Sequence, residues 1–195
     1  MKQDGGSLAQ RERWALCDLL NELGPDSPTL CAGWRSADLA AHLLTRERRP
    51  DGALGLVTGL EPFKSWTTRV RQGARDTETW DTLVSRVRSG PPPLLRPVDR
   101  AINTIEYFVH HEDLRRAQPD WQPRHLATAD EAELWHRARS VGKLSRHPVA
   151  GRIEAPGLEP VVVSKKGGPI VRGPVGEVVM WLLGRKEAAR VEIVA

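Results

Sequence analysis

The stretch Ile105-Glu106-Tyr107-Phe108-Val109-His110-His111-Glu112-Asp113 lies near the middle of the 195-residue chain. Residues four apart on an α-helix lie about 40° from each other around its axis, so Glu106 and His110 present a carboxylate and an imidazole side by side. These two groups are most of a metal site. An inward-facing histidine on another helix would complete it, and the clearest candidate is His42 in Asp38-Leu39-Ala40-Ala41-His42-Leu43-Leu44. Two nitrogens and one carboxylate leave a position for water or a substrate thiol, as open catalytic zinc sites do.

The same residues also have plainer interpretations. Glu106 and His110 are spaced as a solvated helix pair, which stabilises a helix by about 0.2–0.5 kcal/mol. His42, among leucines, is also typical of a hydrogen-bonded core histidine. On a helical wheel, Glu106 and His110 share one flank of the apolar stripe, where burial is costly unless they are paired or bound to an ion. His111 lies on the other flank and is predicted not to be a ligand.

Composition limits the class of protein. With 39% hydrophobic residues, the chain can bury one core and a small annex. No run approaches the roughly 20 apolar residues of a membrane span, and the first residues lack the apolar region of a signal peptide. We therefore expect a cytoplasmic protein without a membrane partner. Cys17 and Cys31 are too few for a disulfide framework and are expected to be reduced.

The charges of the chain are mixed along the sequence. The 29 basic residues exceed the 25 acidic ones by only four, giving a formal charge of +4. They are interleaved and form no long basic block, whereas a nucleic-acid-binding surface clusters them on one face. The pattern predicts that nucleic acid is not a partner.

Apolar periodicity and capping residues predict a mainly α protein. Helices are expected over residues 8–23, 36–49, 63–74, 80–87, 97–116 and 128–141, with a partly helical stretch at 51–60. Beyond residue 148, short β-branched runs punctuated by glycine and proline indicate strands at 149–154, 160–164, 169–172 and 191–194, with a helix at 175–183. The prediction is a helical domain of residues 1–147 followed by a small α+β domain of residues 148–195.

Three stretches together resemble a known family. They are Gly33-Trp34 followed by the segment containing His42, the segment Asn103 to Asp113, and the segment Gly173 to Arg185. In type, order and spacing they look like the DinB-like metal-binding superfamily, and more narrowly its actinobacterial branch that includes mycothiol-dependent maleylpyruvate isomerase. The last segment resembles the C-terminal domain of that branch. The resemblance implies a four-helix bundle holding a divalent ion, usually zinc, on His42, Glu106 and His110.

The function implied by this resemblance is a thiol-dependent transferase or isomerase. Its partners would be a small-molecule thiol, mycothiol or a similar compound, and a small electrophilic substrate. Asp113, one turn beyond His110, is a candidate for orienting an imidazole, and Arg46 and Arg49 are candidates for binding an anionic substrate. Two other functions stay open at this point: a non-catalytic module with a structural or sensory metal, and a metal-free module that binds a ligand or partner.

Overall fold

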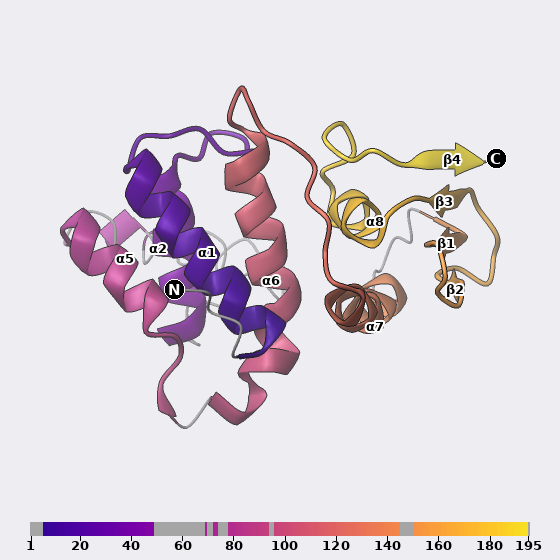
Figure 1. Ribbon diagram of the computed structural model, residues 1–195, viewed down its shortest axis with the longest axis horizontal. Coiled ribbons are helices and arrows are strands. Elements are labelled where there is room, and N and C mark those ends of the chain that lie inside the picture. Colours follow the sequence, from indigo (N-terminus) through magenta and orange to yellow (C-terminus); the bar gives the residue numbers. More distant parts are fainter. Residues whose placement is uncertain are drawn as a thin grey trace. The chain divides into compact units, whose positions relative to one another are not determined.

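The computed structural model describes residues 6–48, 69, 72–73, 78–93, 96–144 and 150–194. These residues form six helices and a small four-stranded sheet (Figure 1), which confirms the mainly helical prediction. The helices expected over residues 51–60 and most of 63–74 lie outside the described residues. The chain divides into two compact units, Met1–Trp121 and Gln122–Ala195. Among the described residues, no helix combines the length and the apolar character needed to cross a membrane.

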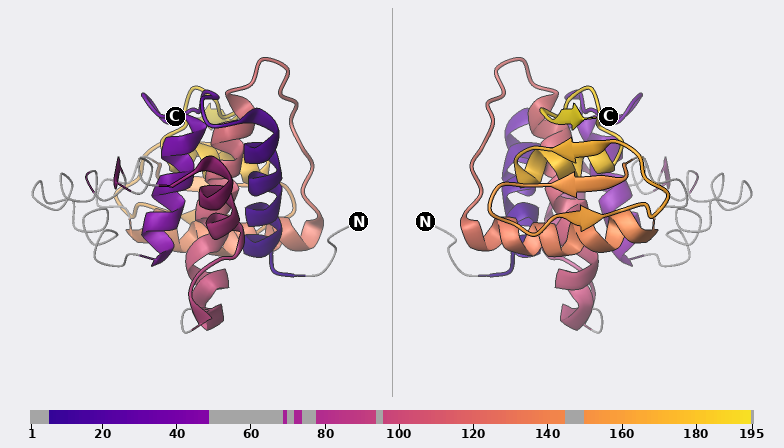
Figure 2. Two further views of the ribbon diagram at one scale, coloured as in Figure 1. Left: turned by 90° about the vertical axis from the view of Figure 1, so that its left-hand side faces the viewer. Right: turned by 90° about the vertical axis from the view of Figure 1, so that its right-hand side faces the viewer.

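The described helices of the first unit are α1 (Leu8–Leu23), α2 (Ser36–Arg48), α5 (Trp80–Arg88) and α6 (Arg96–Arg116). Helix α1 packs against both α6 and α5, and α5 packs against α2. The left view of Figure 2 shows α5 between α1 and α2. Their shared core is apolar and contains Leu16, Leu20, Leu39, Leu43, Leu83, Val84, Val87 and Leu114. These four helices lie where the sequence predicts them, and their assignment to a DinB-like bundle stays a prediction.

Helix α1 begins and ends where its sequence predicts. The Ser7 hydroxyl accepts a hydrogen bond from the Gln10 amide at 3.3 Å, and the Ser7 amide donates to Gln10 Oε1 at 3.0 Å. This reciprocal capping box satisfies two amides that the first turn leaves without helical partners. The helix stops at Gly24, whose φ of 76° suits glycine better than any other residue.

The loop between α1 and α2 is fastened at several points. Ser36 is the first residue of α2, and its hydroxyl donates to the Gly24 carbonyl. Pro28 and Arg35 form a β-bridge that closes the loop. The Leu30 amide donates to the Asp113 carbonyl on α6 at 3.0 Å. The loop therefore has a fixed place beside the end of α6.

Cys17 is packed in the core of the first unit with no exposed surface. Burial raises the pKa of its thiol to about 12, although the nearby positive charges of Arg88 and Arg13 oppose the increase. At pH 8 only ~1 in 10⁴ of such thiols is a reactive thiolate. Ellman's reagent is therefore expected to titrate one thiol, Cys31, in the native protein and two after unfolding. Equal rates for both cysteines in native protein would contradict this placement.

The second unit contains α7 (Thr128–Leu144), α8 (Val175–Leu182) and a sheet of β1 (Arg152–Glu154), β2 (Val161–Val162), β3 (Ile170–Arg172) and β4 (Glu192–Val194). The strand order is β2-β1-β3-β4; β1 and β3 are parallel and the other two pairs are antiparallel. Helices α7 and α8 pack together on the same side of the sheet, whose other face is toward the viewer in the right view of Figure 2.

The division between the units differs from the sequence-based boundary. The sequence placed residues 1–147 in one domain, whereas the first unit ends at Trp121 and the second begins at Gln122. The difference is α7, which packs against α8. Trp135 of this helix is buried and donates its indole N–H to the Glu159 carbonyl at 3.0 Å. Helical periodicity alone shows which face of α7 is apolar, but not which partner covers that face.

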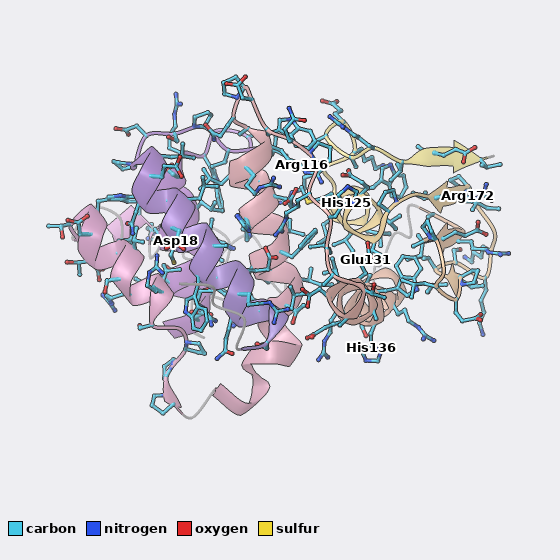
Figure 3. All side chains as sticks on the ribbon, viewed as in Figure 1. Asp18, Arg116, His125, Glu131, His136 and Arg172 are labelled. Carbon is cyan, nitrogen blue, oxygen red and sulfur yellow. The ribbon has the colours of Figure 1, made fainter. Side chains whose placement is uncertain are left out.

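One row of the sheet carries alternating charges. Glu154, Arg172 and Glu192 lie opposite one another on β1, β3 and β4. Arg172 Nε is 2.9 Å from a Glu154 oxygen, and its Nη1 is 3.6 Å from a Glu192 oxygen. Half of the Arg172 side chain is exposed, and Figure 3 shows it at the sheet. Such solvated pairs add little stability, and this row is best described as a solvated face.

Candidate metal centre

Helices α2 and α6 bring together the three residues that the sequence singled out. His42 comes from α2, and Glu106 and His110 come from successive turns of α6. The two imidazole rings lie 5.1 Å apart between centroids in a T-shaped arrangement. His110 Nε2 is 3.6 Å from Glu106 Oε2. One ligand atom from each of the three residues lies within 4.8 Å of the others.

The cluster is buried on one side and open on the other. Both histidines are 7% exposed, and the His42 ring also packs against Trp34, with 5.2 Å between ring centroids. The Glu106 side chain is 34% exposed. A small molecule would therefore approach the cluster past Glu106, while the imidazoles are held by packing.

Asp113 binds the other nitrogen of His110. Its Oδ2 lies 2.9 Å from His110 Nδ1, and the Asp113 side chain is fully buried. A carboxylate at this position keeps a proton on Nδ1. When the ring loses its other proton, from Nε2, the lone pair of Nε2 becomes available to a metal ion. Metal-binding histidines are commonly oriented by such a partner. The structure thus places Asp113 where the sequence suggested it could orient an imidazole.

Charges around the cluster shift the acidity of two of its members. Burial raises the pKa of Glu106, but the His110 hydrogen bond and the Arg46 charge more than offset this and lower it to about 2. For His110, burial lowers the pKa, whereas hydrogen bonds with Asp113, Cys31 and Glu106 raise it well above its ordinary value. These shifts favour the ionised form of Glu106 and the protonated form of His110, so a metal ion bound at His110 would displace a proton.

Arg46 of α2 borders the cluster on its open side. Its Nε is 3.5 Å from Glu106 Oε2, and its guanidinium also donates to Asn103 Oδ1. Sequence reasoning named Arg46 as a possible anion-binding residue, and the structure places its charge beside the candidate ligands. Arg49, named with it, lies outside the described residues.

Arg46 is connected through Asn103 to a buried polar network. Asn103 Nδ2 donates to Glu47 Oε1 at 2.9 Å, and the same oxygen accepts from Arg13 at 2.5 Å. The Arg13 guanidinium lies over the Tyr107 ring, 4.4 Å from its centroid. The sequence analysis missed this network because its members come from three helices and follow no local spacing rule.

Cys31 was predicted to be an ordinary reduced loop thiol, and the structure places it next to the cluster. Its Sγ is 3.2 Å from Asp113 Oδ2, and Cys31, His110 and Asp113 form a second group whose ligand atoms lie within 4.8 Å of one another. Cys31 and Asp113 are 82 positions apart in the chain. No spacing pattern in the sequence links them.

The other described histidines have different surroundings. His111 Nδ1 lies 2.8 Å from Glu12 Oε2 of α1, and both residues are buried. His111 thus faces α1, on the flank opposite Glu106. His125 and His136 belong to the second unit, the first in the segment before α7 and the second on α7 (Figure 3).

No protein-family model, curated protein or solved structure matches this chain. Support for a metal centre therefore comes from the convergence of His42, Glu106 and His110, and the resemblance to the DinB-like superfamily stays a prediction.

The donor set fits a divalent ion. Zinc binds imidazole nitrogen and carboxylate oxygen at about 2.0–2.2 Å, so tetrahedral ligand atoms lie about 3.4 Å apart. The His110–Glu106 separation of 3.6 Å is close to this value. The ligand atoms of the three residues lie within 4.8 Å of one another, so small side-chain movements would bring all of them to the ligand spacing of one ion. Two nitrogens and one oxygen suit zinc and similar first-row metals. Three protein ligands also leave one position open, which is typical of catalytic rather than structural zinc.

Proposed function

We propose that this protein binds a divalent metal ion, most suitably zinc, through His42, Glu106 and His110, and uses it in a thiol-dependent transfer or isomerisation. The substrates are a low-molecular-weight thiol and a small electrophilic molecule. The observation that carries the proposal is the convergence of the three ligand atoms at a cluster that is buried behind the histidines and exposed at Glu106. Mycothiol is the thiol that the sequence resemblance implies.

Each residue of the centre has a chemical role in this proposal. A divalent ion held here supplies the positive charge that stabilises a thiolate at neutral pH. His42 and His110 hold it with neutral nitrogens, and Glu106 neutralises part of its charge on the solvent side. Asp113 orients His110 through Nδ1. Arg46, fixed by Asn103 and Glu106, would attract a substrate that carries a carboxylate.

The proposal predicts thiol-dependent chemistry that requires the metal. Metal-loaded protein is expected to accelerate the mycothiol-dependent conversion of one or more members of a panel of small electrophiles, measured by chromatography of the electrophile. In a transfer the free thiol is lost in step with the electrophile, and in an isomerisation the thiol is regenerated. His42→Ala, with its fold checked by circular dichroism, is expected to give only the uncatalysed rate because one of three ligands is missing.

A direct observation would separate an enzyme from a binding module. In cobalt-substituted protein, a thiol that enters the open position produces a thiolate-to-cobalt charge-transfer band. Metal-loaded protein that shows neither this band nor thiol-dependent conversion of an electrophile would overturn the catalytic part of the proposal and leave a non-catalytic metal-binding module.

A further inference from the structure

Cys31 and His110 meet on a single oxygen atom of Asp113. Cys31 Sγ lies 3.2 Å from Asp113 Oδ2, and His110 Nδ1 lies 2.9 Å from the same oxygen. The thiol donates to this oxygen, and the His110 ring donates to it in the tautomer that carries a proton on Nδ1. A continuous hydrogen-bonded chain thus runs from the α1–α2 loop through α6 to a candidate metal ligand.

We propose that Cys31 is a positioning residue of the metal centre, which acts through Asp113 on His110 and raises the affinity of the site for its ion. This inference rests on the proposed function, because it gives a role to a residue beside the same ligands. Its effect is on metal affinity and on the geometry of the bound ion.

The loop is held so that Cys31 can perform this role. The Leu30 amide donates to the Asp113 backbone carbonyl at 3.0 Å, and Thr29 Oγ1 accepts from the Cys31 amide at 3.2 Å. The Asp113 side chain has no exposed surface. Two donors on one buried oxygen restrict rotation of the carboxylate, and the carboxylate in turn fixes the plane of the His110 ring. His110 Nε2 is thereby directed to the side where Glu106 lies.

The geometry favours this role over direct ligation by Cys31. Asp113, which Cys31 contacts, meets His110 at Nδ1, whereas Glu106 lies at Nε2 of the same ring. The contacts of 2.9 Å and 3.2 Å around Asp113 Oδ2 are ordinary for charge-assisted hydrogen bonds. They are shorter than the spacing of about 3.4 Å or more between ligands around one zinc ion. Cys31 is therefore not a ligand itself and acts on the site through Asp113.

The test measures cobalt affinity by chelator competition and records the absorption spectrum of the bound cobalt. Cys31→Ala removes the donor and is expected to bind cobalt about three- to tenfold more weakly, the effect of one hydrogen bond. Cys31→Ser keeps a donor and is expected to stay within about twofold of wild type. Cys17→Ala changes the other cysteine, in the core, and serves as the matched control with unchanged affinity.

If the role of Cys31 were purely structural, Cys31→Ala would lower thermal stability and leave the cobalt spectrum unchanged. Cys31→Ser would then not restore the lost stability. If a loop variant does not fold, iodoacetamide treatment of folded Cys17→Ala protein blocks the Cys31 thiol directly, and the same loss of affinity is expected.

Two results would overturn the positioning role while leaving the metal centre intact. One is wild-type affinity and spectrum in Cys31→Ala. The other is a thiolate-to-cobalt band in wild-type protein without added thiol that is lost in both Cys31 variants, because it would make Cys31 a ligand. Wild-type protein that binds no cobalt would instead remove the proposed function itself, and the role of Cys31 with it.

Discussion

His110→Ala is expected to lose the metal ion. His110 belongs to both groups of potential ligands and contacts Glu106 with one nitrogen and Asp113 with the other. Replacing even an outer partner of a ligand lowers metal affinity by about 10–100-fold. Removing the ligand itself should therefore weaken binding by more than about 100-fold. Isothermal titration of metal-free protein with zinc measures the change.

The neighbouring histidine provides the matched control for this variant. His111 lies on the same helix and is equally buried, but it pairs with Glu12 of α1. His111→Gln keeps a polar group that can bind Glu12, and it should retain zinc affinity close to that of wild type. Equal losses of affinity in His110→Ala and His111→Gln would show that metal binding depends on the packing of α6 and not on His110 as a ligand.

Glu47→Ala is expected to destabilise the first unit by about 3 kcal/mol. The side chains of Glu47 and Arg13 are 1% and 4% exposed, and they form an ion pair at 2.5 Å. Removing one member of a buried ion pair leaves the other charge in a poorly solvated place. Asn103 would lose the same acceptor. Urea unfolding followed by circular dichroism gives the change in the free energy of unfolding.

An exposed ion pair of the same length tests the role of burial. Asp18 of α1, labelled in Figure 3, pairs with Arg88 of α5 at 2.5 Å, but the two side chains are 64% and 32% exposed. Asp18→Ala should therefore change the free energy of unfolding by less than about 1 kcal/mol. If Asp18→Ala and Glu47→Ala have similar effects, the buried network does not contribute as its geometry indicates.

Local sequence signals predicted the parts of this structure that local forces determine. Ser7 and Gly24 mark the ends of α1 because a side-chain cap and a positive φ angle each depend on a few neighbouring residues. Glu106 and His110 lie side by side because helix geometry places residues i and i+4 together. The proximity of His42 depends on the packing of α2 near α6; the sequence offered His42 as an inward-facing histidine, and the family resemblance supported that choice, but no local rule determines the packing.

Local sequence signals could not predict the contacts between segments that are distant in the chain. Cys31 reaches Asp113 through a loop closed by Pro28 and Arg35, and no periodicity encodes that path. The Arg13–Glu47 pair likewise joins helices whose relative rotation depends on the whole core. The packing of α7 on α8 has the same origin, since an apolar stripe does not specify its partner.

The most direct test of the metal centre is the metal content of the purified protein. Wild-type protein and His42→Ala are dialysed against zinc, freed of loosely bound ions and analysed by elemental mass spectrometry. We expect about one zinc ion per wild-type chain and close to none in the variant, as for a three-ligand site that loses one ligand. Wild-type protein that stays empty after exposure to zinc and to nickel would contradict the metal centre and the function proposed from it.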